Sequence, residues 1–311
     1  MTLIKSISGI RGTIGGKAGE SLTPIDIARF ASAYGTWIKT KSKDNKIVIG
    51  RDARPSGKMV SDIVSASLRA LGLDVIDLEL STTPTVEIAV VEEKAAGGII
   101  ITASHNPVQW NALKLLNEDG EFISAKDGEE VLAIADKEDY TFVEVKKLGK
   151  YRTDNTYIQK HIDKILALDL VDVDAIKKKN FKVAIDCVNS TGGIAVPLLL
   201  ERLGVRTVKQ YYCEPDGHFA HNPEPLPENL GFISAEIENG NFDLGIVVDP
   251  DVDRLCFINQ DGTFFGEEYT LVAVAKYVLE NKKGNTVSNL SSTRALRDVT
   301  EKLGGEYHAS A

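Results

Sequence analysis

The sequence of 311 residues lacks any apolar run that could cross a membrane. Its longest apolar runs, such as 97–101 and 244–248, are far shorter than the roughly 20 residues that a spanning helix needs. The chain also does not open with a charged segment followed by an apolar stretch, as a secretory signal would. We therefore expect a cytoplasmic protein that does not bind membranes.

Cysteine is scarce as well. The three cysteines, Cys187, Cys213 and Cys256, are odd in number and lack CxxC or Cys/His spacing, which argues against a disulfide framework and a zinc site. Neither GxGxxG nor GxxxxGK[ST] occurs, so the pair Gly192-Gly193 at a helix start is interpreted as tight turn geometry.

The balance of charge is acidic. There are 36 basic and 45 acidic residues, and the resulting net charge of −9 opposes attraction to nucleic acid. A small anionic substrate would need a local cluster of Arg, Lys and His. Apolar residues make up 43% of the chain, enough for packed cores, and the length predicts two domains or three smaller ones.

Apolar periodicity predicts strands that alternate with helices, and therefore α/β layers with mixed, mostly parallel sheets. In such folds ligands gather at the carboxyl ends of the strands. The predicted strands are 46–50, 74–80, 98–102, 181–188, 243–248 and 286–290, and the predicted helices are 24–38, 58–72, one from about Pro84, 156–168, 193–203, 267–281 and 293–303.

Composition also suggests where the domains divide. The segment 120–152 is charged and weakly periodic, as expected for surface elements that lead into a linker, and a domain boundary is expected near residue 150. Residues 255–265 alternate like a hairpin with a turn at Asp261-Gly262. Residues 306–311 begin an extended run without a partner to continue its sheet.

A polar turn follows the predicted strand 98–102. It places the hydroxyl of Ser104, a possible nucleophile, beside the imidazole of His105. Ser-His-Asn-Pro is also ordinary turn chemistry, and on these residues alone the turn is the favoured interpretation.

A second polar turn, Asp249-Pro250-Asp251-Val252-Asp253, follows the predicted strand 243–248. Carboxylates at alternate positions can converge on one Mg²⁺ ion, which prefers oxygen ligands. A solvated acidic turn is the alternative, while an EF-hand lacks its Gly and distal Glu here. Because carboxylates next to a buried strand are costly without a cation, we favour metal binding.

Other segments carry weaker signals. Arg11 lies between Gly9 and Gly12, where a flexible, glycine-rich start with a solvated arginine is favoured. Lys114 could point back at the serine turn, although most lysines are solvated. The run 50–57 is at least as consistent with a structural Arg/Asp network as with substrate contact, and His218 and His221 lie in a proline-rich loop where surface histidines are common.

In combination these motifs resemble the α-D-phosphohexomutases, which include phosphoglucomutase, phosphomannomutase and phosphoglucosamine mutase. The motifs that carry the resemblance are SGIRG (8–12), GRDARPSG (50–57), TASHNP (102–107), NALK (111–114), the loop 215–230 and DPDVDR (249–254). The pair formed by TASHNP and DPDVDR is highly specific, and the resemblance runs along the whole chain.

The resemblance implies an intramolecular phosphotransferase, an isomerase that interconverts hexose 1-phosphate and hexose 6-phosphate through a phosphoserine and a hexose 1,6-bisphosphate. It implies that Ser104 carries the phosphoryl group, and that Asp249, Asp251, Asp253 and an oxygen of Ser104 hold Mg²⁺. Arg11 and Arg254 would contact the phosphoserine, with Arg11 part of the catalytic set. His105 and Lys114 would be acid/base groups, and Lys114 would also contact phosphate.

The sequence departs from the family in several places. Pro250, Val252, Trp110 and Ala112 replace commoner residues, which puts the loop conformations in doubt more than the metal site. The resemblance implies domains at 1–152, 153–255 and 256–311, of which the third is incomplete. The family's sugar-contacting loop and C-terminal phosphate-holding loop are missing, so we expect the fragment to be poorly active by itself. Two alternatives stay open: a metal-dependent phosphatase or phosphotransferase with an aspartyl nucleophile, and an inactive binding remnant. The sugar, whether glucose, mannose or glucosamine phosphate, and the oligomeric state are not predicted.

Overall fold

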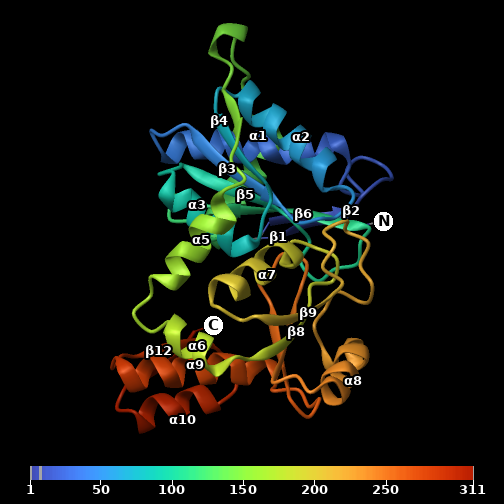
Figure 1. The fold of residues 1–311 in the computed structure, drawn as a ribbon. Helices are drawn as coiled ribbons and strands as arrows, with labels where there is room; N and C mark the ends of the chain where they lie inside the picture. Colours follow the sequence, from blue (N-terminus) through green and yellow to red (C-terminus); the bar gives the residue numbers. More distant parts are fainter. Residues whose placement is uncertain (1, 7–8, 311) are drawn as a thin grey trace.

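A computed structural model describes residues 2–6 and 9–310 of the chain. Ser8 of the SGIRG motif and Ala311 of the terminal extended run lie outside the described residues. The chain forms a first α/β unit, a second α/β unit packed against it, and a small third group of elements beside the second, as the colour gradient of Figure 1 shows. The α/β architecture with mostly parallel strands is confirmed.

The first sheet has seven strands in the order β1-β2-β6-β5-β3-β4-β7. The pairs that join β3, β4, β5 and β7 are parallel, and those that join β1, β2 and β6 to the sheet are antiparallel. The strands are β1 (Leu3–Ser6), β2 (Gly9–Thr13), β3 (Lys46–Arg51), β4 (Asp74–Leu80), β5 (Gly97–Ile101), β6 (Trp110–Leu116) and β7 (Tyr151–Thr153).

Helices cover both faces of this sheet. Helices α1 (Pro24–Lys41), α2 (Gly57–Ala70) and α4 (Ala125–Lys137) pack on one face, with Ile47 and Ile49 of β3 beneath them. Helix α3 (Thr83–Glu92) covers the other face of the sheet, and the side chain of Val48 belongs to the apolar cluster beneath this helix. The alternation along β3 follows from the two-residue period of a strand and gives the unit its three layers.

One expectation for this unit is wrong, and the structure defines two further segments more closely. The start of the chain is not a loose glycine-rich segment, because β2 pairs with both β1 and β6. The NALK segment is part of strand β6. Helix α4 lies within 120–152 and begins with a capping box at Ser124. Only three residues of this helix are buried, which is too few for a clear apolar period in the sequence.

The second sheet has four strands in the order β11-β10-β8-β9, of which only the pair of β10 and β11 is antiparallel. Helix α7 packs on one face and α8 on the other, over two separate apolar clusters. The elements are α5 (Tyr157–Leu166), α6 (Val173–Lys179), β8 (Lys182–Asp186), α7 (Gly192–Arg202), β9 (Thr207–Tyr211), α8 (Gly231–Gly240), β10 (Leu244–Val248) and β11 (Leu255–Asn259), with short 3-10 turns at Val145–Lys147 and Pro227–Asn229.

The third group consists of α9 (Glu267–Asn281), β12 (Thr286–Asn289), α10 (Ala295–Lys302) and β13 (Tyr307–Ser310). The terminal strand β13 does have a partner, because it pairs in parallel with β12.

Strand pairing indicates where the units begin and end, since β7 belongs to the first sheet and β11 to the second. We therefore propose boundaries just after Thr153 and after the bridge between Ile258 and Phe264.

Among the described residues no helix is both long enough and apolar enough to span a bilayer.

Candidate functional site

The serine turn leaves the carboxyl end of β5, in the middle of the first sheet. Ser104 is only 8% exposed and has a left-handed backbone, with φ of +50°. Its amide donates to Thr102 Oγ1 at 2.9 Å, and the Thr102 hydroxyl donates to Asp52 Oδ2 at 2.7 Å. Such a backbone is costly for a residue other than glycine and is often found at functional sites. The turn thus holds the Ser104 hydroxyl in one place.

Arg54 holds the serine turn through hydrogen bonds to its main chain. It is almost completely buried, and it donates to the main-chain carbonyls of Ser104, Asn106, Pro107 and Trp110. Its Nε donates to Asp52 Oδ2 at 2.9 Å, and neither side chain is exposed. The run 50–57 therefore contains the structural Arg/Asp network that the sequence suggested, and Arg54 shapes the serine turn without facing the site.

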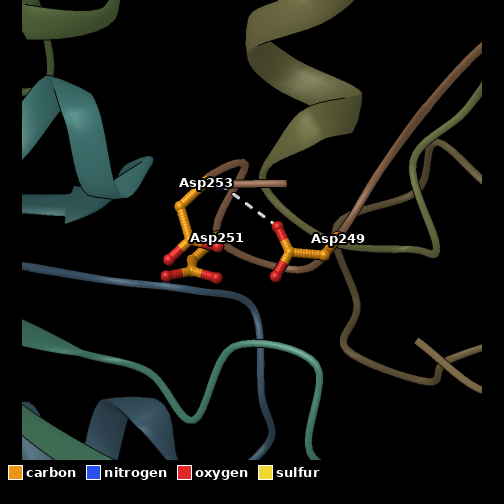
Figure 2. Close-up of side chains that lie close together, drawn as sticks. All are labelled: Asp249, Asp251 and Asp253. Carbon is orange, nitrogen blue, oxygen red and sulfur yellow. Dashed lines mark hydrogen bonds between the residues drawn. The ribbon is translucent and has the colours of Figure 1, made fainter. Parts of the chain in front are cut away.

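The acidic loop follows β10 in the second sheet. Asp249, Asp251 and Asp253 each offer a carboxylate oxygen, and these oxygens lie within 4.8 Å of one another (Figure 2). The loop is bent around the first carboxylate, since the amides of Asp253 and Arg254 donate to Asp249 Oδ1 at 3.1 and 3.2 Å. The carboxylates therefore converge as the sequence hypothesis requires.

Three hydroxyl residues from other elements fix the acidic loop. Ser190 and Thr191, at the start of α7, donate to the carbonyl of Pro250 at 2.7 and 2.8 Å. Thr83 of the first unit donates its amide to the Asp251 carbonyl at 2.8 Å and its hydroxyl to the Asp251 carboxylate. The loop is therefore anchored in both units, and sequence reasoning missed these anchors because single hydroxyl residues carry no pattern.

The two turns meet at a single point between the units. Ser104 Oγ donates to Asp249 Oδ2 at 2.7 Å, and Asp253 Oδ1 lies 3.3 Å away. Lys114 Nζ, from β6, lies 2.8 Å from Asp251 Oδ2 and 2.9 Å from Asp253 Oδ2. Residues from three strands of two sheets are thus brought into one cluster.

The pKa values of the two buried aspartates and of Lys114 are shifted by burial and by the charges of their neighbours. Burial, together with the neighbouring Asp251 and Asp253, raises the pKa of Asp249 well above its usual range. Burial also acts to raise the pKa of Asp251, but the Lys114 ammonium outweighs it and the pKa is lowered. The pKa of Lys114 is raised, because the attraction of the two aspartates overcomes its own desolvation. Lys114 is therefore a firmly protonated counter-ion.

The donor set also suits a hard divalent cation. Asp251 Oδ1 is buried and has no hydrogen-bond partner, which costs free energy unless another ligand reaches it. The three carboxylates repel one another, and a cation between them would relieve that repulsion. Carboxylate oxygens are also the ligands that Mg²⁺ prefers in proteins. Asp249, Asp251 and Asp253 are accordingly the residues that could hold the metal.

The remaining candidate residues lie around the serine. A pocket in the first unit is lined by Arg11, Ser104, His105 and Lys114, among others. His105 Nδ1 is 3.4 Å from Ser104 Oγ, and burial, with help from Arg254, lowers the His105 pKa. The side chain of Arg254 is engaged elsewhere, because its Nη1 donates to Glu224 Oε1 at 2.9 Å.

Two other sequence candidates lie outside this cluster. His221 pairs with the buried Asp186 at 3.0 Å, and His218 gives its carbonyl to the Asn189 side chain. Gly193 is a packing position, since a Cβ there would meet the Cys213 carbonyl at 2.0 Å. Gly192 and Gly193 are the first residues of α7 and neither has a positive φ, so close packing rather than a tight turn accounts for this pair.

Comparison with known proteins gives a consistent result. Residues 3–142 match the family model for phosphoglucomutase/phosphomannomutase α/β/α domain I, and residues 159–262 match the model for domain II. A Thermococcus kodakarensis protein named phosphoglucomutase/phosphomannomutase is 35% identical over 95% of this chain and 65% of its own length. A Methanopyrus kandleri protein named probable phosphoglucosamine mutase is 32% identical over 96% of this chain and 63% of its own length.

The fold is shared with solved structures. A crystal structure of a candidate phosphomannomutase from Thermus thermophilus superposes with a TM-score of 0.87, at 26% identity, over all of this chain and 69% of that one. The chain spans just under two thirds of the length of the two sequence relatives described above.

Proposed function

Because the chain belongs to the phosphoglucomutase/phosphomannomutase family, the α-D-phosphohexomutases, we propose that its protein moves a phosphoryl group between Ser104 and a hexose phosphate. The contact of Ser104 Oγ with Asp249 Oδ2 at 2.7 Å carries this proposal. It puts the Ser104 hydroxyl, on a residue with a left-handed backbone, against a carboxylate cluster suited to a cation. A phosphoryl group on this oxygen would lie beside three carboxylates that Lys114 balances only in part, so a cation would be needed there.

We propose that Asp249, Asp251 and Asp253 hold Mg²⁺ together with an oxygen of phosphorylated Ser104. The bound ion would supply neutralisation of charge during phosphoryl transfer. Without such an ion, three carboxylates would repel the phosphate at this place. Arg11 and Arg254 are proposed to contact phosphate oxygens, since guanidinium groups match phosphate geometry.

The proton steps can be divided between His105 and Lys114. A sugar hydroxyl attacks the phosphorus of phosphorylated Ser104, the bond from phosphorus to the serine oxygen breaks, and a new bond to the sugar oxygen forms. The attacking hydroxyl must lose its proton. The lowered pKa of His105 leaves its imidazole neutral, able to accept that proton and to pass it to the departing Ser104 oxygen, which lies 3.4 Å from Nδ1. Lys114 stays protonated and can act as hydrogen-bond donor and charge partner.

The reaction would proceed by a second transfer in the opposite direction. The hexose 1,6-bisphosphate reorients in the cleft and returns its other phosphate to Ser104, so that the 1- and 6-phosphates exchange. The names of the relatives include phosphoglucomutase, phosphomannomutase and phosphoglucosamine mutase, so glucose, mannose and glucosamine phosphates are the proposed substrates.

A coupled assay of the full-length protein with these three sugar phosphates tests the proposal. We expect isomerisation that needs Mg²⁺, stops on chelation and is absent from Ser104→Ala. Release of inorganic phosphate without isomerisation would instead favour a phosphatase. A full-length protein that binds the sugars but catalyses neither reaction would favour the binding remnant.

A further inference from the structure

Glu224 lies between two residues of the candidate site that come from different units. Its Oε1 accepts from Arg254 Nη1 at 2.9 Å, and the same oxygen is 3.8 Å from His105 Nε2. His105 belongs to the serine turn and Arg254 to the acidic loop. We propose that Glu224 is a positioning residue that holds Arg254 and His105 in place around Ser104, an inference that rests on the proposed function.

The loop that carries Glu224 is built to keep its carboxylate in place. The Glu224 amide donates to Asn222 Oδ1 at 3.2 Å, and its carbonyl accepts from the Leu226 amide at 2.8 Å and from Asn229 Nδ2 at 2.9 Å. Both flanking prolines, Pro223 and Pro225, are buried. A loop of this kind leaves Glu224 little backbone freedom, so its side chain is presented in one direction.

A second ion pair fixes the loop to the sheet below. His221 Nε2 lies 3.0 Å from Asp186 Oδ2, and Asp186, at the carboxyl end of β8, is 1% exposed. The pKa of His221 is raised because Asp186 outweighs the effect of burial. The loop is therefore tied to the second sheet three residues before Glu224, and Glu224 reaches across to the first unit from a fixed base.

The charge of Glu224 has a consequence for His105. Four charged groups surround this imidazole: Arg254, Arg11, Glu224 and Asp253. The Glu224 carboxylate also balances the Arg254 guanidinium beside it. Loss of the carboxylate would free Arg254 to move and would expose His105 to its uncompensated charge.

A purely structural role for this ion pair is a weaker explanation. The side chains of Glu224 and Arg254 are each about a third exposed, and such pairs add little to stability. If Glu224 only joined two surface groups, its loss would leave the rate of phosphoryl transfer unchanged. A positioning role instead predicts a change in rate with little change in stability.

The test compares Glu224→Gln with Glu228→Gln, an exposed glutamate of the same loop. Each protein is mixed with glucose 1,6-bisphosphate and Mg²⁺, and the rate of Ser104 phosphorylation is followed by mass spectrometry. We expect Glu224→Gln to be roughly 10- to 100-fold slower, the usual cost of losing a supporting contact of a site, while Glu228→Gln matches the wild type. Glu224→Asp, which keeps the charge, should recover part of the rate even if the Gln variant folds poorly.

An NMR measurement gives a readout that does not need turnover. The Nε–Hε signal of Arg254, followed in the same proteins, should shift in Glu224→Gln, because the guanidinium loses its partner, and stay unchanged in Glu228→Gln. Equal phosphorylation rates in the two Gln variants, with an unchanged Arg254 signal, would overturn the proposal. A wild type that gains no phosphate would contradict the proposed function instead, and the Arg254 signal would still decide whether Glu224 holds Arg254.

Discussion

Replacement of Arg54 by methionine should unfold the first unit more easily and disorder the serine turn. Arg54 is 1% exposed, Asp52 is fully buried, and the guanidinium joins that carboxylate to four carbonyls of the turn. Removal of one partner of a buried ion pair costs about 3–5 kcal/mol, because the other charge stays buried without compensation. We therefore expect Arg54→Met to lose about 3–5 kcal/mol of unfolding free energy.

Urea denaturation followed by tryptophan fluorescence measures this loss. Both tryptophans, Trp37 and Trp110, lie in the first unit, so the signal reports on that unit alone. The matched control is Arg51→Met, since Arg51 is partly exposed and donates one long bond to the Asp52 carbonyl at 3.3 Å. It should cost less than about 1 kcal/mol.

A double variant isolates the cause. Adding Asp52→Asn to Arg54→Met removes the stranded charge and should recover about 1 kcal/mol or more, although the carbonyls stay unpaired. A stability of Arg54→Met within about 1 kcal/mol of wild type, with normal phosphorylation of Ser104, would refute the view that Arg54 shapes the turn.

Three further predictions concern the acidic loop and its surroundings. Asp251→Asn should weaken Mg²⁺ binding, measured by calorimetry, by at least roughly tenfold, since it removes a charge from the ligand set; equal affinity would count against the loop. Val252→Gly should leave stability unchanged or raise it by up to about 1 kcal/mol, because Val252 has a φ of +61°. Val252→Ala, which loses the same packing against the apolar cluster below α7 but keeps a Cβ at this φ, should be less stable than Val252→Gly. Burial raises the pKa of Glu87 from 4.5 to about 7, so the folded protein binds this proton more tightly than the unfolded chain, and stability should decline as pH rises between these values. Glu87→Gln should remove that decline in urea titrations at several pH values; an identical pH dependence would contradict it.

The sequence predicted those parts of the fold in which one short segment carries its own pattern. Strand β4 and helix α9 have the predicted bounds, because alternating or helical apolar periods are local. Strand β2 was missed, since GIRGT has two glycines and becomes a strand only through its neighbours β1 and β6. Helix α4 was missed because six of its 13 residues are charged and only three are buried, which leaves a weak apolar period.

In the candidate site too, residues with a local sequence pattern were predicted and residues that act through distant contacts were not. Ser104 and the three aspartates were proposed from residue type and from their position after strands, and the structure brings them into contact. The functions of Arg54, Thr83 and Glu224 could not be predicted, because each acts on a segment far away in the sequence. Contacts of that kind follow from how the two sheets pack against each other.

The central claim is that Ser104 carries the phosphoryl group. The most direct measurement is phosphosite mapping of the protein after incubation with glucose 1,6-bisphosphate and Mg²⁺, under conditions that preserve acyl phosphates. We predict one phosphoryl group per chain on Ser104 and none in Ser104→Ala. Phosphate on Asp249, Asp251 or Asp253, with Ser104 unmodified, would contradict the account.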